Sequence, residues 1–457
     1  MKELSRRDAL ARERAVLVSV LLPDQDNLRR SDDPLEELKG LAATTGAELV
    51  GELIQNRPAP DPTTYLGKGK LEQLRLLVES VDADVVAFDN DLSAAQTRNL
   101  EQALQVKVLD RTEVILDIFA SRAQTHESRL AVELAQLQYA LPRLKRMWTH
   151  LSRMKMGVGM RGPGEKQLEV DRRLVEKRIH DLQTELGEVE RRKQRQVAAR
   201  RGRLTVSLVG YTNAGKSTLL NALTGSEVLV EDKLFATLDT RTRRWQLPGW
   251  GPVLLSDTVG FIRDLPHHLI ASFKATLEES RQADLLLHVA DASNPNARDQ
   301  ISAVYRVLAE MHIEEKDTLL ILNKTDAAPH GVLVEGLLHR YPNAVPISAA
   351  TGAGLDDFAA AVSKALSRDF LDLDVETSVG DGQLMAYLAD QGEILSQQFT
   401  ETRVRIHCRV PASAMGGINS DAKVEIRKSN AKAVANNPDD SRDDPFSRET
   451  VSRSPST

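Results

Sequence analysis

The feature that most constrains the fold of this chain is the stretch LTVSLVGYTNAGKSTLLNAL at residues 204–223. An apolar run of strand composition leads into the pattern G-x-x-x-x-G-K-S at residues 210–217, and an amphipathic helical pattern follows. Glycines let the backbone curl around a phosphate with its N–H groups directed inward, and the helix N-terminus behind the loop favours the same negative charge. The stretch therefore predicts a phosphate-binding loop (P-loop) between a buried strand and a helix of an α/β domain.

Three shorter motifs follow in order, each directly after an apolar run. In D-T-V-G at residues 257–260, the carboxylate can reach Mg²⁺, often through water, and the glycine amide can bond a γ-phosphate. In N-K-T-D at residues 323–326, the last carboxylate can pair with the N1–H and the N2 amino group of guanine, an edge that adenine lacks. In P-I-S-A at residues 346–349, the last amide can meet guanine O6. With the P-loop, these motifs predict a GTP-binding domain at residues 203–368.

The segment LFATLDTRTRRW at residues 234–245 lies between the first two motifs. In a nucleotide switch, a mobile segment must bring a threonine hydroxyl to Mg²⁺ and the γ-phosphate. We predict Thr237 for this role, with Thr240 and Thr242 as competing candidates. The alternative is that Thr237 is only a β-forming residue of an edge strand.

The chemistry assigns roles to a few of these residues. Lys216 offers a point charge to the β- and γ-phosphates, and the Ser217 hydroxyl ligates Mg²⁺. The predicted catalytic residues are Lys216, Thr237 and Gly260, and the predicted Mg²⁺ ligands are Ser217 and Thr237. The predicted GTP-binding residues are Gly210, Tyr211, Thr212, Asn213, Ala214, Gly215, Lys216, Ser217, Phe235, Ala236, Thr237, Leu238, Asp239, Asp257, Thr258, Val259, Gly260, Asn323, Lys324, Thr325, Asp326, Ile347, Ser348 and Ala349.

Phe261 stands where many GTPases place a glutamine that orients the attacking water. An aromatic ring cannot orient water by hydrogen bonding, so we expect unassisted hydrolysis to be slow, or another group or partner to position the water. Asn213 in the P-loop resembles the asparagine of potassium-responsive GTPases, whose carbonyl helps to hold a monovalent cation. The alternative is that Asn213 is only a turn former.

The flanking segments predict further units. Residues 15–125 alternate apolar runs with helical patterns, and this alternation predicts a parallel α/β domain. Residues 371–411 contain one helical pattern at 383–395 and one strand pattern, which predicts a small C-terminal α+β domain. Residues 412–457 are rich in Ser, Asn, Asp, Ala and Pro without an apolar period, so we predict a disordered tail.

Residues 126–201 predict a helical hairpin. The first helix is expected to kink at Pro142, four glycines and a proline at 157–165 predict a loop, and a heptad-like seam follows. Between Arg143 and Arg203 there are 18 Lys and Arg against 8 Asp and Glu, whereas the whole chain has a net charge of −6. The hairpin is either a solvated coiled coil or a projecting probe that contacts a polyanion. The tip residues that would make this contact are Arg153, Lys155, Arg161 and Lys166.

Composition excludes several classes of protein. A single cysteine, Cys408, excludes an intrachain disulfide and a zinc site of the CxxC type, and it favours a reducing compartment. The charged first 14 residues lack the apolar core of a secretory signal, and the apolar runs at 15–22 and 285–290 are too short to span a bilayer. We expect a cytoplasmic monomer with no membrane span.

The chain resembles the HflX family of translational GTPases over about residues 15–410. The resemblance rests on the strings TTYLGKGK, FDNDLSAAQTRNLE, VLDRTEVILDIFASRAQTHESRLAVELAQLQY, RGPGEKQLEVDRR, GYTNAGKST, FATLDTRTR, DTVGFIRDLP and NKTD. It implies an N-terminal α/β domain with a helical hairpin, a Ras-like G domain and a small C-terminal domain. It also implies binding to the 50S subunit near the peptidyl-transferase centre, contact of the tip with 23S rRNA, and splitting or rescue of stalled 70S ribosomes under stress.

The tip departs from the family pattern, because Met154, Met156 and Met160 interrupt the glycine-rich stretch and Lys166 replaces a common threonine. The resulting hypothesis is a GTPase that uses Mg²⁺, and K⁺ as an activating cation, and that associates partly with ribosomes. Two other classes stay open at this point. One is an RNA-remodelling module in which GTP only regulates binding, and the other is a signalling GTPase that dimerises through the hairpin.

Overall fold

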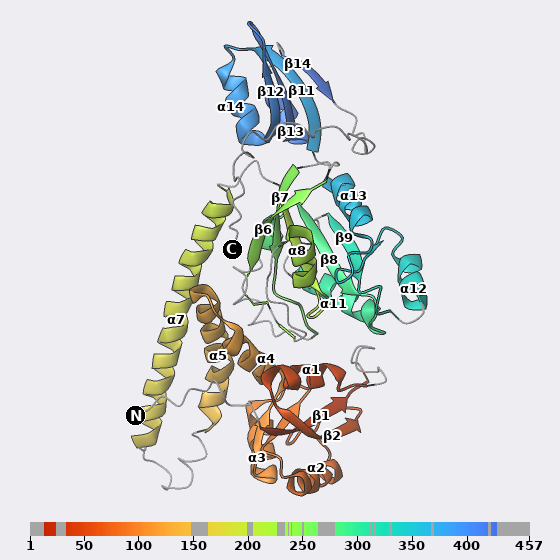
Figure 1. The fold of residues 1–457 in the computed structure, drawn as a ribbon. Coiled ribbons are helices and arrows are strands. Elements are labelled where there is room, and N and C mark those ends of the chain that lie inside the picture. Colours follow the sequence, from red (N-terminus) through yellow and green to blue (C-terminus); the bar gives the residue numbers. More distant parts are fainter. Residues whose placement is uncertain are drawn as a thin grey trace, which may run out of the picture.

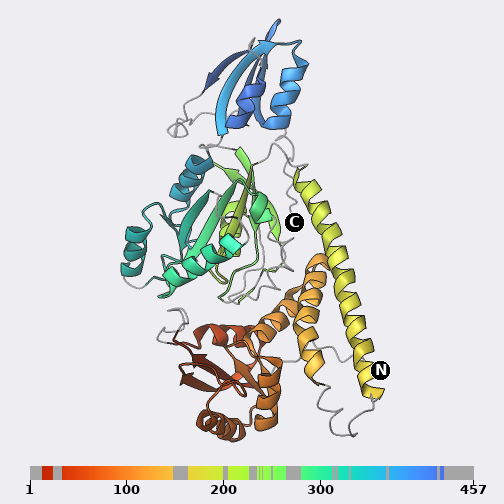
Figure 2. The ribbon, with the colours of Figure 1, turned by 180° about the vertical axis from the view of Figure 1, so that it is seen from behind.

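Three domains and one long helix make up the described structure (Figure 1). The computed structural model describes residues 13–23, 33–147, 163–198, 204–225, 234–235, 237–238, 240–248, 251–263, 279–310, 313, 317–328, 331–366, 370–418 and 422–426. The N-terminal domain lies at one end, the P-loop domain in the middle and the C-terminal domain at the other end, and helix α7 runs alongside (Figure 2). No helix within these ranges is both long and apolar enough to cross a membrane.

The N-terminal domain contains the predicted parallel sheet, with strand order β2-β1-β3-β4. Its strands are β1 (Arg14–Leu21), β2 (Glu48–Asn56), β3 (Val85–Phe88) and β4 (Lys107–Leu109), and its helices are α1 (Glu36–Thr45), α2 (Lys68–Val81), α3 (Ala94–Leu104) and α4 (Arg111–Arg122). Helices α2 and α3 bury their apolar faces on one side of the sheet, and α1 and α4 on the other. The side with α1 and α4 also faces the P-loop domain, where the two share one hydrophobic cluster.

The hairpin consists of α5 (His126–Met147) and the 36-residue α7 (Pro163–Ala198). Leu182 and Leu186 of α7 are buried in the seam, where apolar residues recur with helical spacing. The predicted loop at 157–165 is wrong at its end, because α7 begins at Pro163. Proline suits the first turn of a helix, where its missing N–H has no partner to lose.

The P-loop domain has the strand order β10-β9-β8-β5-β7-β6, in which only the edge strand β6 is antiparallel to its neighbour. Its elements are β5 (Thr205–Gly210), α8 (Lys216–Thr224), β6 (Arg241–Leu247), β7 (Gly251–Asp257), β8 (Leu285–Asp291), α11 (Ala297–Glu310), β9 (Thr318–Asn323), α12 (Val332–Arg340), β10 (Val345–Pro346) and α13 (Leu355–Leu366). Because the strands from β10 to β7 are parallel, their carboxyl ends meet at one edge. The four motifs therefore converge there.

The C-terminal domain is an antiparallel sheet of order β12-β13-β11-β14 with one helix against it. Its elements are β11 (Phe370–Ser378), α14 (Gly382–Gln391), β12 (Glu393–Phe399), β13 (Arg403–Pro411), the 3₁₀-helix η3 (Ala412–Gly417) and β14 (Lys423–Ile426). The helix predicted at 383–395 ends early at Gln391, because the backbone is extended at Gly392 and β12 follows. Gly392 lies so close to the Arg409 carbonyl of β13 that a side chain there would clash. The prediction of a disordered tail from residue 412 is wrong for residues 412–418 and 422–426, and the rest of the predicted tail lies outside the described residues. Strand β14 is short and polar, and its ladder with β11 holds it in place, which no apolar period reveals.

Candidate active site

The P-loop leaves β5 at Gly210 and enters α8 at Lys216. Gly210 and Gly215 both have positive φ values, of 150° and 90°. A Cβ atom at Gly210 would lie 2.2 Å from the Val289 carbonyl oxygen, and one at Gly215 would lie 2.3 Å from Nδ2 of Asn323. Only glycine fits both places. Asn213 has a φ of 60°, in the left-handed region that asparagine tolerates better than most residues.

The ammonium group of Lys216 is buried inside the loop. Its Nζ donates to the carbonyl oxygens of Gly210 (3.1 Å) and Tyr211 (2.8 Å). Burial lowers the pKa of Lys216 to about 8, and the Asp257 carboxylate acts in the opposite direction. Because an ammonium group has three N–H donors, Lys216 can still donate to a phosphate oxygen. The loop therefore fixes one cation in advance at the place where an anion would bind.

Three oxygen-bearing side chains meet beside Lys216. Ser217 Oγ lies 2.8 Å from Thr237 Oγ1 and donates to Asp257 Oδ2 at 2.6 Å. Asp257 Oδ1 is buried and has no hydrogen-bond partner among the described residues. Burial raises the pKa of Asp257, while Lys216 and the two hydroxyls oppose this rise.

This cluster fits Mg²⁺. An octahedral Mg²⁺ ion binds hard oxygen ligands at about 2.0–2.1 Å, which places adjacent ligands roughly 3 Å apart. The Ser217–Thr237 spacing agrees with two such ligands, and the orphaned Asp257 oxygen is suited to a metal-bound water. Of the competing threonines, Thr242 is turned to Ser256 and Glu279, and no interaction links Thr240 to this cluster among the described residues.

The D-T-V-G motif lies directly against the P-loop. Phe261 N–H donates to the Gly210 carbonyl (3.0 Å), and Thr212 N–H donates to the Phe261 carbonyl (2.7 Å). Gly260 is so close that a Cβ atom there would lie 2.8 Å from the Thr212 Cα atom and 3.1 Å from Lys216 Nζ. Its amide is therefore near the lysine that would hold the phosphates. The Phe261 side chain is buried and contributes no hydrogen-bonding group to the site.

Asn323 ties the P-loop to the last two motifs. Its Nδ2 donates to the Ala214 carbonyl, and its Oδ1 accepts from the Ala349 amide, both at 2.9 Å. The Ala349 amide was predicted to meet guanine O6, whereas in the structure it holds Asn323. Thr325 Oγ1 donates to the Ile347 carbonyl, and Lys324 pairs with Asp291. Asp326 lies exposed after β9, where its carboxylate can be reached by a base.

Some predicted residues lie elsewhere. The side chains of Tyr211, Phe235 and Leu238 are buried in the hydrophobic cluster shared with the N-terminal domain. Val259 is buried in the same cluster, and Thr258 and Ser348 are also buried. Ala236, Asp239, Arg153, Lys155 and Arg161 lie outside the described residues. Lys166 lies near the start of α7, and its side chain is not described.

Sequence reasoning missed four charged residues behind the site: Glu37, Asp89, Arg111 and Arg263. They come from two domains and join in one buried network that also reaches Tyr211 of the P-loop. A signal was present in the strings FDNDLS, VLDRTEV and DTVGFIRDLP, in which charged residues interrupt or directly follow apolar runs. No spacing in the sequence, however, indicates that these charges meet.

Comparison with known proteins identifies the family. Three family models match: GTP-binding GTPase N-terminal at residues 32–120, GTP-binding GTPase Middle Region at 122–200, and 50S ribosome-binding GTPase at 205–324. The GTPase HflX of Lacrimispora saccharolytica is 45% identical over 90% of this chain and 97% of its own length. This chain belongs to the HflX family of GTPases. The HflX of Escherichia coli K12 is 46% identical over 78% of this chain and 84% of its own length.

The family assignment establishes the chain as an enzyme that hydrolyses GTP. Among solved structures, the chain is similar to a GTP-binding protein from the archaeon Sulfolobus solfataricus in complex with GDP. That protein is 22% identical and covers 78% of this chain and 99% of its own, with a TM-score of 0.41.

Proposed function

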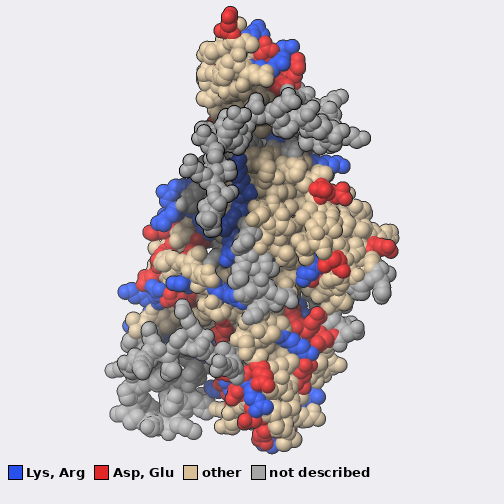
Figure 3. All heavy atoms as spheres, viewed as in Figure 1, with Lys and Arg blue, Asp and Glu red and all other residues tan. Residues whose placement is uncertain are grey.

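We propose that this HflX-family GTPase binds the 50S ribosomal subunit in its GTP state and splits or rescues stalled 70S ribosomes. The observation that carries the proposal is the basic hairpin joined to a G domain that matches the 50S ribosome-binding GTPase model. In Figure 3, Lys and Arg side chains gather over β6 and the neighbouring part of α7. Strand β6 contains Arg241, Arg243 and Arg244. RNA phosphates are the natural partner of such surfaces.

The geometry of the site supports a set of proposed nucleotide contacts. Lys216 and the P-loop amides hold the phosphates, the Gly260 amide and Thr237 sense the γ-phosphate, and Asp326 reads guanine. Ser217 and Thr237 hold Mg²⁺, with Asp257 accepting from Ser217. When bound, Mg²⁺ offsets the negative charge of the phosphate oxygens.

Water activation requires a group from outside the predicted set, because Phe261 is buried among apolar side chains. A K⁺ ion held by Asn213, or a ribosomal group, would supply the missing stabilisation of charge. We therefore expect slow hydrolysis by the isolated protein and faster hydrolysis with 50S subunits.

Sucrose-gradient sedimentation of purified 70S ribosomes tests the proposal. The protein is added with GTP, GDP or a non-hydrolysable GTP analogue, and Lys216→Ala serves as the control. We expect conversion of 70S to free subunits with the protein on 50S only in the triphosphate state. Intact 70S with the protein at the top of the gradient would refute it. Unwinding of free RNA duplexes or a protein dimer would then identify one of the two alternative classes.

A further inference from the structure

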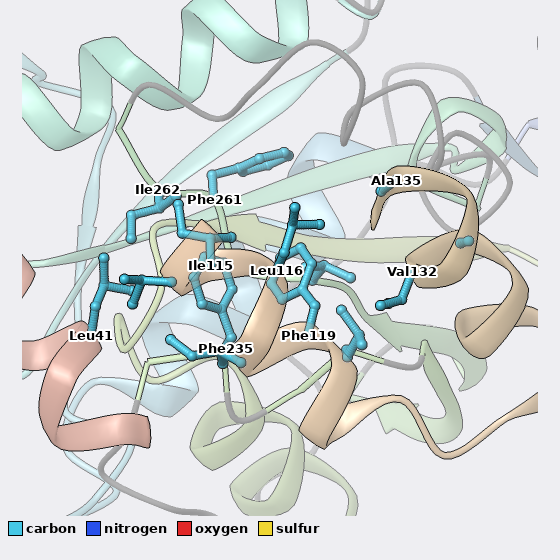
Figure 4. Packing of buried hydrophobic residues seen from close by; sticks show 14 of the residues in the cluster. Leu41, Ile115, Leu116, Phe119, Val132, Ala135, Phe235, Phe261 and Ile262 are labelled. Carbon is cyan, nitrogen blue, oxygen red and sulfur yellow. The ribbon is translucent and has the colours of Figure 1, made fainter. Parts of the chain in front are cut away.

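Three G-domain segments that we assign to the phosphates and Mg²⁺ also contact the N-terminal domain. They are the P-loop at Tyr211, the segment around Thr237, and the end of the D-T-V-G motif at Phe261–Arg263. Figure 4 shows Phe235, Phe261 and Ile262 beside apolar side chains of α1 and α4. In a switching GTPase these segments change with the γ-phosphate. Here the same segments form the surface on which another domain of the same chain is docked.

The contact at Thr237 is mostly apolar. Phe235, two residues before Thr237, packs edge-on against Phe119 of α4, with ring centroids 4.6 Å apart at 89°. The neighbouring Leu234 amide donates to Thr44 Oγ1 of α1 at 3.2 Å. The Phe235 amide donates to Thr212 Oγ1 of the P-loop at 2.8 Å. Phe235 is thus held between the N-terminal domain and the phosphate-binding loop.

The contact at Tyr211 and Arg263 is polar and buried. Tyr211 donates its hydroxyl proton to Glu37 Oε1 (2.8 Å) and accepts from the Arg263 amide (2.8 Å). The Arg263 guanidinium donates to Asp89 Oδ2 at 3.0 Å. Arg111 completes the network, with bonds to Asp89 Oδ1 (2.7 Å), Glu37 Oε1 (2.7 Å) and the Arg263 carbonyl (3.1 Å).

The network is balanced in charge, with two guanidinium groups and two carboxylates. Asp89 is fully buried, and Arg111 and Arg263 are nearly so. Burial raises the pKa of Tyr211 well above its ordinary value, and Glu37 raises it further, so Tyr211 stays a hydroxyl and can donate. A shift of Arg263 or Tyr211 would leave buried charges unpaired, so the network tolerates few arrangements.

We propose that Glu37, Asp89 and Arg111 are positioning residues of the GTPase, which act through Tyr211 and Arg263 so that N-terminal domain docking and the triphosphate state stabilise each other. The γ-phosphate holds Thr237 and Gly260, and these residues hold Phe235 and Arg263 against the N-terminal domain. Loss of the γ-phosphate loosens this contact. Because linkage is reciprocal, loosening the contact must also weaken triphosphate binding relative to diphosphate binding.

The first test compares the affinities of fluorescent GDP and a fluorescent non-hydrolysable GTP analogue, without ribosomes. We compare the full-length protein with Glu37→Gln and with Thr44→Val, and use Glu36→Gln on the same helix as the matched control, since Glu36 is exposed. We expect Glu37→Gln and Thr44→Val to lower the affinity for the analogue relative to that for GDP by about fivefold or more. A factor of this size is typical of allosteric coupling. The affinity of both variants for GDP should be unchanged, and the control Glu36→Gln should bind both nucleotides as tightly as the wild type does.

The second test measures the distance between the domains by spin-label spectroscopy, with labels at Gln73→Cys and Ala360→Cys, two exposed positions on α2 and α13. We expect one narrow distance distribution with the GTP analogue and a broad one with GDP. Glu37→Gln should broaden the distribution measured with the GTP analogue. If the network had only a structural role, Glu37→Gln would lower the affinity for both nucleotides equally. The distance distribution would then not depend on the nucleotide.

Equal affinity ratios in all variants, or identical distributions with both nucleotides, would overturn the proposal. The proposal rests on the GTPase activity alone. It can fail while ribosome splitting stands, and the reverse also holds.

Discussion

Removal of the Arg111 guanidinium should destabilise the N-terminal domain and its docking more than any surface substitution. Arg111 is 1% exposed and pairs with Glu37 and with the fully buried Asp89. Burial on its own would lower the pKa of Arg111, but the two carboxylates raise it above its ordinary value, so the side chain is charged at every accessible pH. Arg111→Met keeps an unbranched apolar side chain, although a shorter one, and removes the guanidinium group with its charge and donors.

The size of the expected loss in stability follows from the charges that remain after the substitution. After Arg111→Met, Arg263 is the one guanidinium group of this network that still pairs with Asp89 and Glu37, so the network carries one excess negative charge. Breaking a buried ion pair from one side costs about 3–5 kcal/mol. The double variant Arg111→Met/Asp89→Asn restores the charge balance. It should be more stable than the sum of the single changes by about 1–3 kcal/mol.

Hydrogen exchange read by mass spectrometry measures the opening free energies of peptides from α1, β3 and α4, without assuming two-state unfolding of the whole chain. Arg75→Met is the control, because Arg75 also pairs with two carboxylates, Glu72 and Glu79, but on the surface. We expect exchange to be unchanged in that variant. The reasoning would be refuted if Arg111→Met lowered the opening free energy by less than about 1 kcal/mol, or if the effects of the two substitutions on it were strictly additive in the double variant.

Three further predictions concern the nucleotide. Thr237→Val should weaken a GTP analogue by about tenfold or more while sparing GDP, whereas Thr242→Val should leave both affinities unchanged, as measured by fluorescence titration. Because the Lys216 pKa is about 8 without a ligand, and a bound phosphate raises it, affinity for GTP should fall by about tenfold between pH 7.5 and pH 9. A calorimetric titration at pH 9 should detect proton uptake on binding, and its absence would contradict this assignment. Replacing Na⁺ with K⁺ should accelerate hydrolysis by the wild type and not by Asn213→Ala, as measured by phosphate release.

The sequence by itself determined the local chemistry of the site. Gly210, Gly215 and Lys216 are recognisable in the sequence, since a phosphate loop needs backbone with positive φ and a lysine at set spacings, although the contacts with Val289 and Asn323 that also require the glycines come from the tertiary structure. The order of the four motifs, each after an apolar strand, was enough to predict where they meet, because parallel strands end at one edge. The hairpin, too, follows from a periodicity that local helix formation produces.

Tertiary structure alone decided which groups surround that chemistry. Glu37, Asp89, Arg111 and Arg263 lie up to 226 positions apart in the chain, and although three of them follow or interrupt apolar runs, no spacing indicates that they meet. Their partnership depends on how α1 and α4 dock against the P-loop domain, and burial turns four unremarkable charges into one network. Strand β14 was missed for a related reason, because its stability comes from pairing with β11 and hardly from its own residues. Local patterns specify elements and loops, whereas long-range burial and pairing are properties of the assembled chain.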